Sequence, residues 1–597
     1  MRVSTLLALA VALVACGGET DGGDPSVIAL DDPTPAHSAP ETPASNAPNP
    51  TAPAPEATPE ESTTDPVIEA LKLVIDAPAR GARTEDDSIR VTGTLTGGES
   101  PSLTVAGQTV RPEANGRFAI DVPVEHGLVI IASEAVDAAG RTAEDRRAVL
   151  VDATAEVDAE ISDAMHVAIG TDALDTASAL ISDYVSELDV SDLLGGNLPD
   201  GVEIESLSYG RINVRIMPRQ GHLQVTLAVD RLRASVAGTV TRLGVSATFR
   251  GSAEADPAEV VARVEVNAAA DGTLDFDVLS ANVTLRRFDY DIRYVPGFLE
   301  DWFANLVRGQ LESIVERTMR DFVVPALFEE DSLTRTVEVF GTELELGLGI
   351  NDIDVTPEGL TVALDAAARA PFLRRAGAAL APQGGKPTMD SKGDVDLAIS
   401  ADLLSRVAHA AWAAGLLDFA LDDTAEVEVP LTLTPAIIAP MLGEAGNDID
   451  FRDPLWVRTS PLLPPVVTIE DGDHPLVLRI GDMLLELSTP DGPLVTLAVQ
   501  IEARIALEVQ TGDEIVFDPD LEVTVHADVA HTPRGPVEEA RLERLVEELA
   551  ALIPGMIADQ TFAFGADVIP VPIRLVQASI DADTSGAPFA HLTATVD

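Results

Sequence analysis

Cysteine, tryptophan and tyrosine are almost missing from this chain. Its 597 residues include one cysteine, Cys16, together with three tryptophans and four tyrosines. A single thiol cannot form an intramolecular disulfide, so the folded parts depend on their apolar cores for stability. The shortage of Trp and Tyr also argues against a carbohydrate-active enzyme, because aromatic rings commonly form the apolar surface of a sugar site.

Basic residues are also few. The chain has 39 Lys and Arg against 99 Asp and Glu, which gives a formal net charge of −60. A chain this acidic repels phosphate backbones, so nucleic acid is excluded as a partner. The same charge disfavours attraction to anionic lipid headgroups through a basic patch.

The motifs of common enzyme chemistry are missing as well. The chain contains no HExxH pair, P-loop, GxSxG elbow or GxGxxG loop. His526 and His531 lie five residues apart on an expected strand, so their side chains point to opposite faces and make a poor zinc pair. The acidic run at 470–474 lacks the oxygen spacing of a calcium loop and is expected to form a hairpin turn. We therefore predict that the protein is not an enzyme and has no catalytic residue, metal site or cofactor.

The first sixteen residues have the pattern of an export signal. A basic start at Arg2 is followed by an apolar run at 6–15, which is too short to span a bilayer. The sequence Leu-Val-Ala-Cys that ends at Cys16 resembles the lipobox of bacterial lipoproteins. That resemblance implies cleavage before Cys16 and attachment of a diacylglyceryl group to its sulfur. The alternative is an ordinary signal peptide with a coincidental cysteine.

The residues after Cys16 indicate where the anchor lies and how far it reaches. Gly17 and Gly18 follow the cysteine, and in lipoproteins of this kind the lack of Asp there favours the outer membrane. Residues 17–66 consist largely of Pro, Ala, Thr, Ser, Asp and Glu, so they cannot bury enough apolar surface to fold. We predict an exported protein, held at the outer membrane by its lipid and separated from it by a disordered tether.

Residues 67–152 have the pattern of a small all-β unit. Alternating apolar and polar runs are separated by turn signals at 97–98, 115–116 and 139–140. The order of these runs, with NGRF between two strands and DAAGR before the last, resembles bacterial Ig-like domains of the glucodextranase B type. The resemblance implies an Ig-like sandwich that acts as a spacer.

Helix and strand patterns then alternate twice. Helices are expected over 155–194 and 296–328, and again over 401–418 and 537–560, with a flexible connector at 373–392 between the two sets. The strands between the helices include alternating runs of fourteen or more residues, far above the average of about 5–6. Such runs suit a strongly twisted sheet, and the recurrence of the pattern indicates an internal duplication.

The segment 296–328 is one of the longer expected helices. Its apolar residues recur at helical spacing, and charged residues lie between them, so one face is apolar and the other polar. An amphipathic helix among strands needs a curved sheet to bury its apolar face. Two outcomes stay open, namely ordinary core packing and a helix that lines a lipid-sized slot in a rolled sheet.

The order of elements over 153–597 resembles the tubular lipid-binding superfamily. The resemblance rests on a helix ending in DLLGG, the strand VEIESLSYGRINVRIM, the helix FLEDWFANLVRGQLESIVERTMRDFVVPAL and the late strand VIPVPIRL. The most similar shape is the family of bactericidal/permeability-increasing protein and lipopolysaccharide-binding protein. This resemblance implies two barrels joined by a central sheet, each with a long helix that leaves an apolar pocket for an acyl chain. No cysteine follows Cys16, so the disulfide of that family has no counterpart.

The predicted fold class is multidomain and β-rich α+β. An Ig-like β-sandwich precedes a two-barrel, boomerang-like module of long twisted antiparallel sheets, each wrapped by long amphipathic helices. The predicted parts are the signal peptide 1–16, the tether 17–66, the Ig-like domain 67–152, the first barrel with central-sheet strands 153–372, the linker 373–392 and the second barrel 393–597.

The predicted ligand is a phospholipid or another acyl lipid, bound without a charged contact. The residues expected to line the two pockets are Trp302, Phe303, Leu306, Ile314 and Met319 in the first barrel, and Leu545, Leu549, Leu552 and Met556 in the second. The same residues also fit a solid core. A structural or adhesive surface lipoprotein therefore stays open as an alternative, and a carbohydrate-active enzyme is the less favoured third.

Overall fold

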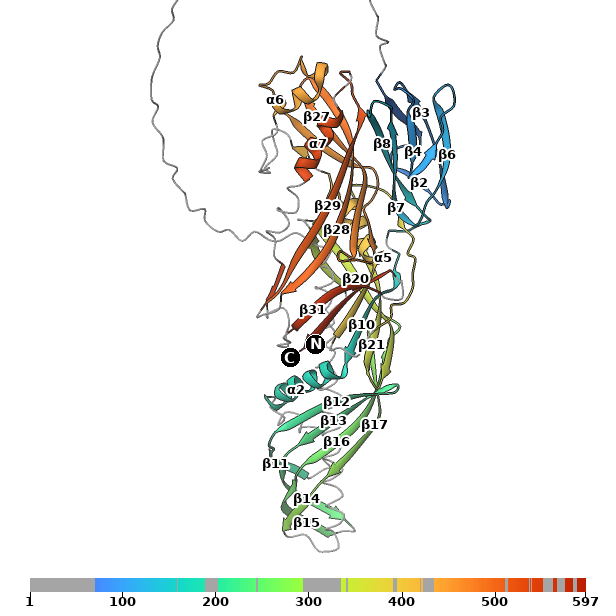
Figure 1. Cartoon of the computed structure of the whole chain (residues 1–597). Coiled ribbons are helices and arrows are strands. Elements are labelled where there is room, and N and C mark those ends of the chain that lie inside the picture. The colour runs from blue at the N-terminus through green and yellow to red at the C-terminus, as the bar shows by residue number, and fades with distance from the viewer. Residues whose placement is uncertain are drawn as a thin grey trace, which may run out of the picture.

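The computed structural model describes most of the chain from residue 70 onward. Strands dominate in several antiparallel sheets, and the four α-helices among the described residues are short (Figure 1). This confirms the prediction of a multidomain, β-rich protein. No helix within the described ranges is long and apolar enough to cross a membrane. The described residues are 70–157, 159–187, 202–242, 245–293, 334–339, 342–389, 395–418, 420–421, 434–510, 514–535, 537, 539–550, 562–565, 575–583 and 588–596.

Two sheets form the Ig-like module at the start of the described chain. Their strand orders are β1-β3-β6 and β2-β8-β7-β4-β5, and Val91, Leu103 and Val149 are fully buried in its core. The predicted turn at 115–116 closes tightly, because a Cβ on Gly116 would lie 2.3 Å from the carbonyl oxygen of Leu95. The strands are β1 (Lys72–Ala77), β2 (Ala82–Thr84), β3 (Ser88–Thr96), β4 (Ser102–Val105), β5 (Gln108–Val110), β6 (Arg117–Pro123), β7 (Gly127–Val136) and β8 (Thr142–Val151).

A seven-stranded sheet occupies the middle of the molecule. Its order is β19-β20-β21-β10-β23-β32-β31, so the two repeats meet where β10 pairs with β23 in antiparallel register. Each of these two strands leads directly into a helix, α2 (Thr171–Glu187) or α5 (Ala401–Ala414), and each pairs outward with a hairpin of its own repeat. The predicted duplication is visible in this mirrored order. The strands are β10 (Ile161–Gly170), β19 (Thr334–Val339), β20 (Thr342–Thr356), β21 (Gly359–Arg369), β23 (Val395–Ser400), β31 (Leu575–Ala582) and β32 (Phe589–Val596).

The prediction of a single helix over 155–194 is wrong for its first part. A short strand, β9 (Thr154–Ala155), and then β10 occupy this part, and α2 begins only at Thr171. β10 lies inside the central sheet with Ala164, Met165 and Ala168 inaccessible, so it lacks the alternation of a half-exposed strand. Ala and Met are also good helix formers, which gave this strand a helical composition. Residues 188–194 lie outside the described part of the chain.

The first unit, residues 202–293, consists of four long strands, and each strand runs through two regions of sheet that follow one another along its length. The orders β11-β14-β15-β18 and β12-β13-β16-β17 run in the same direction across the unit, so each long run predicted from the sequence is one strand with a break in it. The strands are β11 (Val202–Ser208), β12 (Ile212–Arg219), β13 (His222–Val229), β14 (Leu232–Arg242), β15 (Val245–Ala255), β16 (Ala258–Ala268), β17 (Leu274–Leu285) and β18 (Asp289–Arg293).

All four breaks lie at the same level, and Asp256 joins three of them. Its Oδ1 accepts a hydrogen bond from the Arg231 amide at 3.2 Å, its Oδ2 lies 3.2 Å from Arg287 Nη2, and its carbonyl accepts from Arg287 Nε at 2.7 Å. Arg231 and Arg287 both have positive φ, which turns the chain sharply at the break. The sheet of the first unit therefore bends along one line that crosses every strand.

The second unit, residues 420–565, is a sheet of long strands capped by short helices. The order is β24-β25-β27-β28-β29-β30, with β26 paired to β27. The run at 470–474 closes the β26–β27 hairpin, where the Glu470 amide donates to the Pro475 carbonyl, so the predicted turn is confirmed. The elements are β24 (Ala420–Leu421), α6 (Pro435–Ile438), η4 (Ala439–Met441), η5 (Gly443–Gly446), β25 (Trp456–Pro461), β26 (Val466–Ile469), β27 (Leu476–Thr489), β28 (Gly492–Gln510), β29 (Glu514–His531), α7 (Glu539–Ala550) and β30 (Phe562–Gly565).

The two long amphipathic helices of the prediction are only partly covered by these elements. The segment 296–328 lies outside the described residues. Of 537–560, the structure describes a helix at Glu539–Ala550, and residues 551–560 lie outside the described part.

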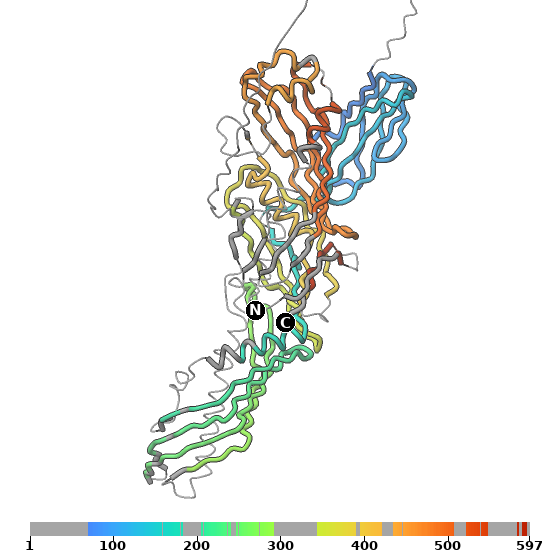
Figure 2. Tube along the Cα trace, turned by 60° about the vertical axis from the view of Figure 1, so that its left-hand side comes forward, coloured from blue at the N-terminus to red at the C-terminus, as the bar shows by residue number. Residues whose placement is uncertain are grey.

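The Ig-like module lies alongside the second unit in both views (Figures 1 and 2). Leu128, Ala148 and Leu150 of the module form one buried cluster with Leu463 and Val466 of the second unit. Beside this cluster, β27 carries a register shift between Ile480 and Met483. Such a bulge turns a strand locally, and here it presses the backbone of residue 481 against β7 and β8.

The predicted flexible connector makes ordered contacts with both neighbours. Its strand β22 (Ala379–Leu380) pairs with β9, and the Arg374 and Arg375 amides donate to the carbonyl of Ala413 at the end of α5. Arg375 also forms an ion pair with Asp418. The described part of the connector therefore lies against the structured core.

We expect Gly481→Ala to loosen the Ig-like module from the second unit. A Cβ at residue 481 would lie 2.4 Å from the Ala148 Cβ and 3.1 Å from a methyl of Leu128, so one surface must move. Overpacking of this kind costs about 1–3 kcal/mol. The measurement is small-angle scattering for the radius of gyration, together with thermal unfolding.

Gly347→Ala is the matched control, because a Cβ there meets only the Ala367 carbonyl oxygen at 4.0 Å. Equal scattering and equal stability of the two variants would show that the packing around Gly481 does not hold the module.

Candidate functional site

The structure describes few of the residues predicted to bind lipid. Cys16, the five predicted pocket residues of the first barrel, Leu552 and Met556 lie outside the described residues. Leu545 is buried on α7, and Leu549 lies on the same helix without a described side chain. The lipid pockets at these positions therefore stay a prediction.

One face of the sheet β12-β13-β16-β17 is an apolar surface of the first unit. Burial alternates strictly along β13 and β16, so every second side chain belongs to this face. Among the described helices, α2 packs against this sheet on β12. The fully buried members on the inner strands are Leu223, Val225, Leu227, Val260, Ala262 and Val264.

Burial on this face decreases toward the edge strand β17. Val278, Val283 and Leu285 continue the same face and are only half-buried, whereas the residues between them, such as Thr284, are exposed. β17 pairs with β16 along its length, which places Val283 beside Val260 and Thr284 beside Glu259. The apolar face therefore has one margin that solvent reaches.

In the second unit, Leu545 belongs to a compact cluster. It lies with Leu542 and Val546 of α7 against Leu497 and Val525 of the sheet. The same cluster extends to Ile438 and Leu442 of the cap formed by α6 and η4. The described residues around Leu545 therefore pack as a protein core and do not line a cavity.

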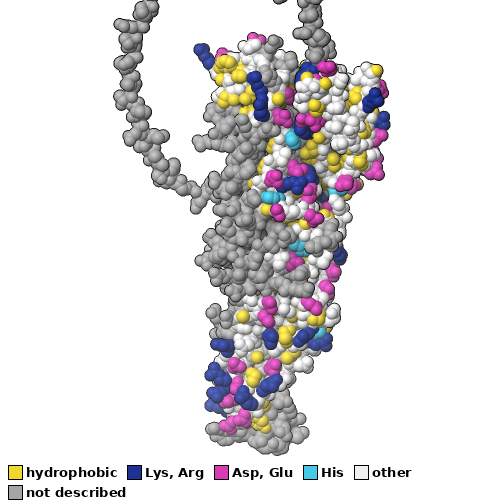
Figure 3. Space-filling view, in the orientation of Figure 1, with side chains coloured by type: hydrophobic (Ala, Val, Ile, Leu, Met, Phe, Trp, Pro, Cys, Tyr) yellow, Lys and Arg dark blue, Asp and Glu magenta, His cyan; other side chains and the backbone are white. Residues whose placement is uncertain are grey.

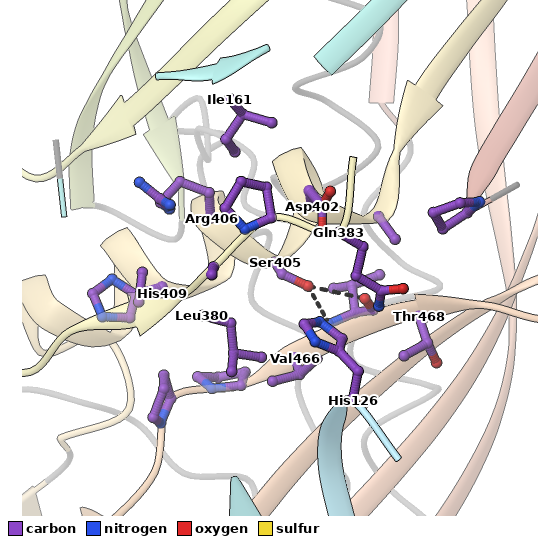
Figure 4. A pocket seen from close by; sticks show the side chains of 18 of the residues that line it. His126, Ile161, Leu380, Gln383, Asp402, Ser405, Arg406, His409, Val466 and Thr468 are labelled. Carbon is purple, nitrogen blue, oxygen red and sulfur yellow. Dashed lines mark hydrogen bonds between the residues drawn. The ribbon is translucent and has the colours of Figure 1, made fainter. Parts of the chain in front are cut away.

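A separate pocket of about 190 Å³ lies where the Ig-like module, the connector and the second repeat meet (Figure 4). His126 comes from the Ig-like module, Gln383 from the connector, and Ser405, Arg406 and His409 from α5. Apolar walls come from Leu380, Val466, Ile161, Pro382, Pro464, Pro465 and Pro588.

The polar groups of Ser405 and Arg406 in this junction pocket form hydrogen bonds with the backbone of other segments. Ser405 Oγ donates to the Val467 carbonyl at 2.9 Å and accepts from the Val467 amide at 3.0 Å. Arg406 Nη1 donates to the carbonyls of Glu156, Val157 and Ala159. Because the Ser405 hydroxyl is committed to the backbone, it is not arranged as a nucleophile with His409.

His409 is a buried imidazole in the wall of the pocket. Burial lowers the pKa of His409 to about 4, and the charges of Arg406 and Arg83 act in the same direction. The ring is therefore neutral at pH 7. Its Nε2 lies 3.1 Å from the Gly377 carbonyl oxygen and donates a hydrogen bond to it. Its Nδ1 is buried and has no hydrogen-bond partner within the described chain.

A half-buried imidazole, His591, is held in the central sheet. His591 Nδ1 lies 3.0 Å from Asp396 Oδ1, and its Nε2 lies 3.0 Å from Asp583 Oδ2. Burial would lower the pKa of His591, but the two carboxylates outweigh burial and raise this pKa above its ordinary value. Both ring nitrogens face carboxylates, and the contact with Asp396 links β32 to β23. No group of three or more metal-ligating side chains occurs among the residues described here.

The charged part of the contact between the Ig-like module and the second unit centres on Asp482. This fully buried carboxylate accepts hydrogen bonds from the Gly81 amide at 2.9 Å, Arg80 Nη1 at 3.1 Å and Gln500 Nε2 at 3.1 Å. The Ala148 amide donates to it at 3.3 Å. Sequence reasoning missed this residue, although a lone Gly-Asp inside the apolar run 476–489 is a bulge signal.

Asp528 lies at the same contact with less favourable surroundings. Its Oδ2 accepts from the Arg146 amide at 3.0 Å, and Arg80 Nη1 lies 3.8 Å away. Burial raises the pKa of Asp528 to about 7; Arg80 opposes this rise and the charge of Asp145 adds to it. Burial also raises the pKa of the neighbouring Glu539. Carboxylates therefore exceed cations at this contact.

The fold and these contacts define a multidomain β-rich protein that begins with an Ig-like module. Residues 71–153 match the family model described as glucodextranase, domain B, so the predicted resemblance of this module is confirmed. No curated protein matches the chain.

Two solved structures show a likeness at low sequence identity. The crystal structure of lipopolysaccharide binding protein matches at 15% identity and a TM-score of 0.38, covering 73% of this chain and 99% of that one. SGBP-B of the Bacteroides ovatus mixed-linkage glucan utilization locus, in complex with a mixed-linkage heptasaccharide, matches at 9% identity and a TM-score of 0.12. That match covers 31% of this chain and 64% of the other.

We expect Asp528→Asn to reduce the pH dependence of stability around neutral pH. The folded protein binds a proton on Asp528 below about pH 7, whereas the unfolded chain binds it only near the ordinary value of 3.8. Stability from this group therefore falls as pH rises through 7, by about 1.4 kcal/mol between about pH 6 and pH 8. Urea unfolding of both proteins at these two pH values measures the difference.

His591 contributes with the same sign and is present in both proteins, so the comparison isolates Asp528. An unchanged pH dependence in the variant would show that Asp528 does not titrate in this range.

Proposed function

We propose that the protein is a lipid-anchored, non-enzymatic envelope protein that holds lipid acyl chains against the apolar faces of its curved sheets. The anchor is the diacylglyceryl group on Cys16, and the location is the outer membrane. The ligand is a phospholipid or another acyl lipid. The resulting architecture is the two-barrel, boomerang-like form in which the segments 296–328 and 537–560 close the two sheets.

The observation that supports the proposal best is the apolar face of β12-β13-β16-β17. It is continuous over four strands, carries no charged side chain on β13, and becomes half-exposed at β17. A face of this kind must be covered by something apolar, because exposed apolar patches of such size are rare in monomeric proteins. The sequence pattern of 296–328 predicts a helix of suitable length with one apolar face, and we propose that an acyl chain fills the space left at the margin.

Energetics favour this mode of binding in so acidic a chain. Burial of an acyl chain contributes about 0.8 kcal/mol per CH₂ group and needs no basic residue. A net charge of −60 would oppose a site that relied on anionic headgroups. The ligand is therefore recognised by its tails.

We expect lipid to copurify with the protein and to be displaced by Val283→Trp. The larger side chain fills the half-buried margin of the apolar face, so bound lipid should fall by about tenfold, the equivalent of roughly 1.4 kcal/mol. Native mass spectrometry with lipid extraction, on protein from a bacterial host, measures the bound lipid. Thermal unfolding shows whether the variant still folds.

Thr284→Trp is the matched control, because Thr284 adjoins Val283 on the exposed face of the same strand. If the wild-type protein carries no lipid and takes none from vesicles, the sheets are solid and the structural or adhesive role takes first place. The compact packing around Leu545 favours that role for the second unit.

We expect Cys16→Ala to release the protein from the membrane. Without the thiol no diacylglyceryl group can be attached, so the protein should move from the membrane fraction to the soluble fraction. Fractionation and metabolic labelling with a fatty acid measure both effects. A variant that stays in the membrane fraction would contradict the anchor.

A further inference from the structure

The cap of the second unit exposes two large apolar side chains. We define the cap as residues 435–454, which comprise α6, η4, η5 and the loop that leads to β25. Ile437 is 41% exposed and Phe451 is 60% exposed. Hydrophobic side chains gather over α6 at this end of the molecule (Figure 3).

The cap holds these side chains outward on a packed base. Ile438 and Leu442 are fully buried in the core of the second unit, and Ile449 is buried with them. Arg541 of α7 donates from Nη1 to the Pro440 carbonyl at 3.1 Å. Gly446 lies so close to Ala439 that an added Cβ would meet its carbonyl oxygen at 2.0 Å. The exposure of Ile437 and Phe451 thus belongs to an ordered surface.

The position of the cap shows what it faces. The cap and the start of β1 lie at the same end of the molecule in both views (Figures 1 and 2). This arrangement is fixed, because Asp482 and the cluster around Leu128 hold the Ig-like module on the second unit. Residues 17–69 join this end of the molecule to the anchor at Cys16, and this Pro-rich stretch of 53 residues can reach up to about 3.1 Å per residue. The bilayer that holds the anchor therefore lies within reach of the cap.

Charge decides which lipid surface fits. The basic residues Arg452 of the cap and Arg541 of α7 are exposed, but the cap also carries Asp448, Asp450 and Asp453. With carboxylates in excess, electrostatic attraction to an anionic surface is weak, and apolar insertion must supply the contact. A zwitterionic bilayer surface meets that requirement.

We propose that the cap is the face on which the protein rests on the bilayer of its own anchor, with Phe451 and Ile437 inserted among zwitterionic headgroups. The proposal rests on the lipid anchor of the proposed function. It adds an orientation, in which the second unit adjoins the membrane and the first unit projects away from it.

The test uses the fact that the chain has no cysteine other than Cys16, which the lipid blocks. A cysteine introduced by Phe451→Cys in the lipidated full chain accepts a single fluorophore. The protein is reconstituted in phosphatidylcholine–phosphatidylethanolamine vesicles that carry a headgroup-level quencher lipid. We expect the probe on F451C to be quenched at least about threefold more than a probe on F372C, since only the former lies at the interface.

F372C is the matched control, because Phe372 is even more exposed, at 79%, and follows β21 in the chain instead of lying on the cap. Leu279→Cys, at 52% exposure on β17, provides a second control on the first unit. Equal quenching of the three probes would overturn the orientation. Quenching greatest on L279C would overturn it as well and would place the first unit at the membrane.

Three further measurements separate the remaining outcomes. Wild-type protein that fails to float with the vesicles would refute the anchor itself, whereas floating protein with an unquenched F451C probe refutes only the cap. Energy transfer between F451C probes in detergent would show that a second copy covers the cap, which also overturns the proposal. Ile437→Asp combined with a probe on Arg452→Cys should lose the quenching if insertion holds the cap down, and Phe372→Asp with the same probe should keep it.

Discussion

The antiparallel pairing of β10 with β23 is the constraint on which the rest of the structure depends. These are the first strands of the two repeats, and each is buried inside a seven-stranded sheet. Their backbone groups can be satisfied only by each other on that side, so the two repeats cannot separate without exposing both strands. The helices α2 and α5 leave this pair in opposite directions, which sends the first and second units to opposite ends of an elongated molecule (Figure 2).

Much of the fold could be predicted from the sequence, because alternation and turn chemistry are local signals. The Ig-like strands, the turn at 470–474 and the internal duplication all follow from such patterns. The strand β10 was not predicted, because a strand buried on both faces has no alternation of apolar and polar residues and this one is rich in helix-forming residues. The bend through Asp256 was not predicted for a different reason. It needs the breaks in four strands to lie at one level, and only the strand register brings these breaks together.

The site was harder to predict than the fold. An amphipathic pattern identifies which side chains turn inward but gives no indication whether they meet protein or a cavity, as Leu545 shows. The junction pocket and the contact at Asp482 join residues hundreds of positions apart, so no spacing in the sequence marks them. The Ig-like module was expected to be a spacer, yet a bulge in β27 and an ion network attach it to the second unit. The Ig-like module therefore has a fixed position on the second unit and is more than a spacer.

That attachment has a consequence for the order in which the protein is made. Leu128, Ala148 and Leu150 belong to a module that can complete its own sandwich early, but their partners arrive much later, since Ala148 and Asp482 are 334 residues apart. A chain is synthesised N-terminus first, so the finished module must wait with this apolar strip uncovered. During that interval the strip resembles an unprotected binding surface. Rapid completion of the second unit therefore limits association through this surface.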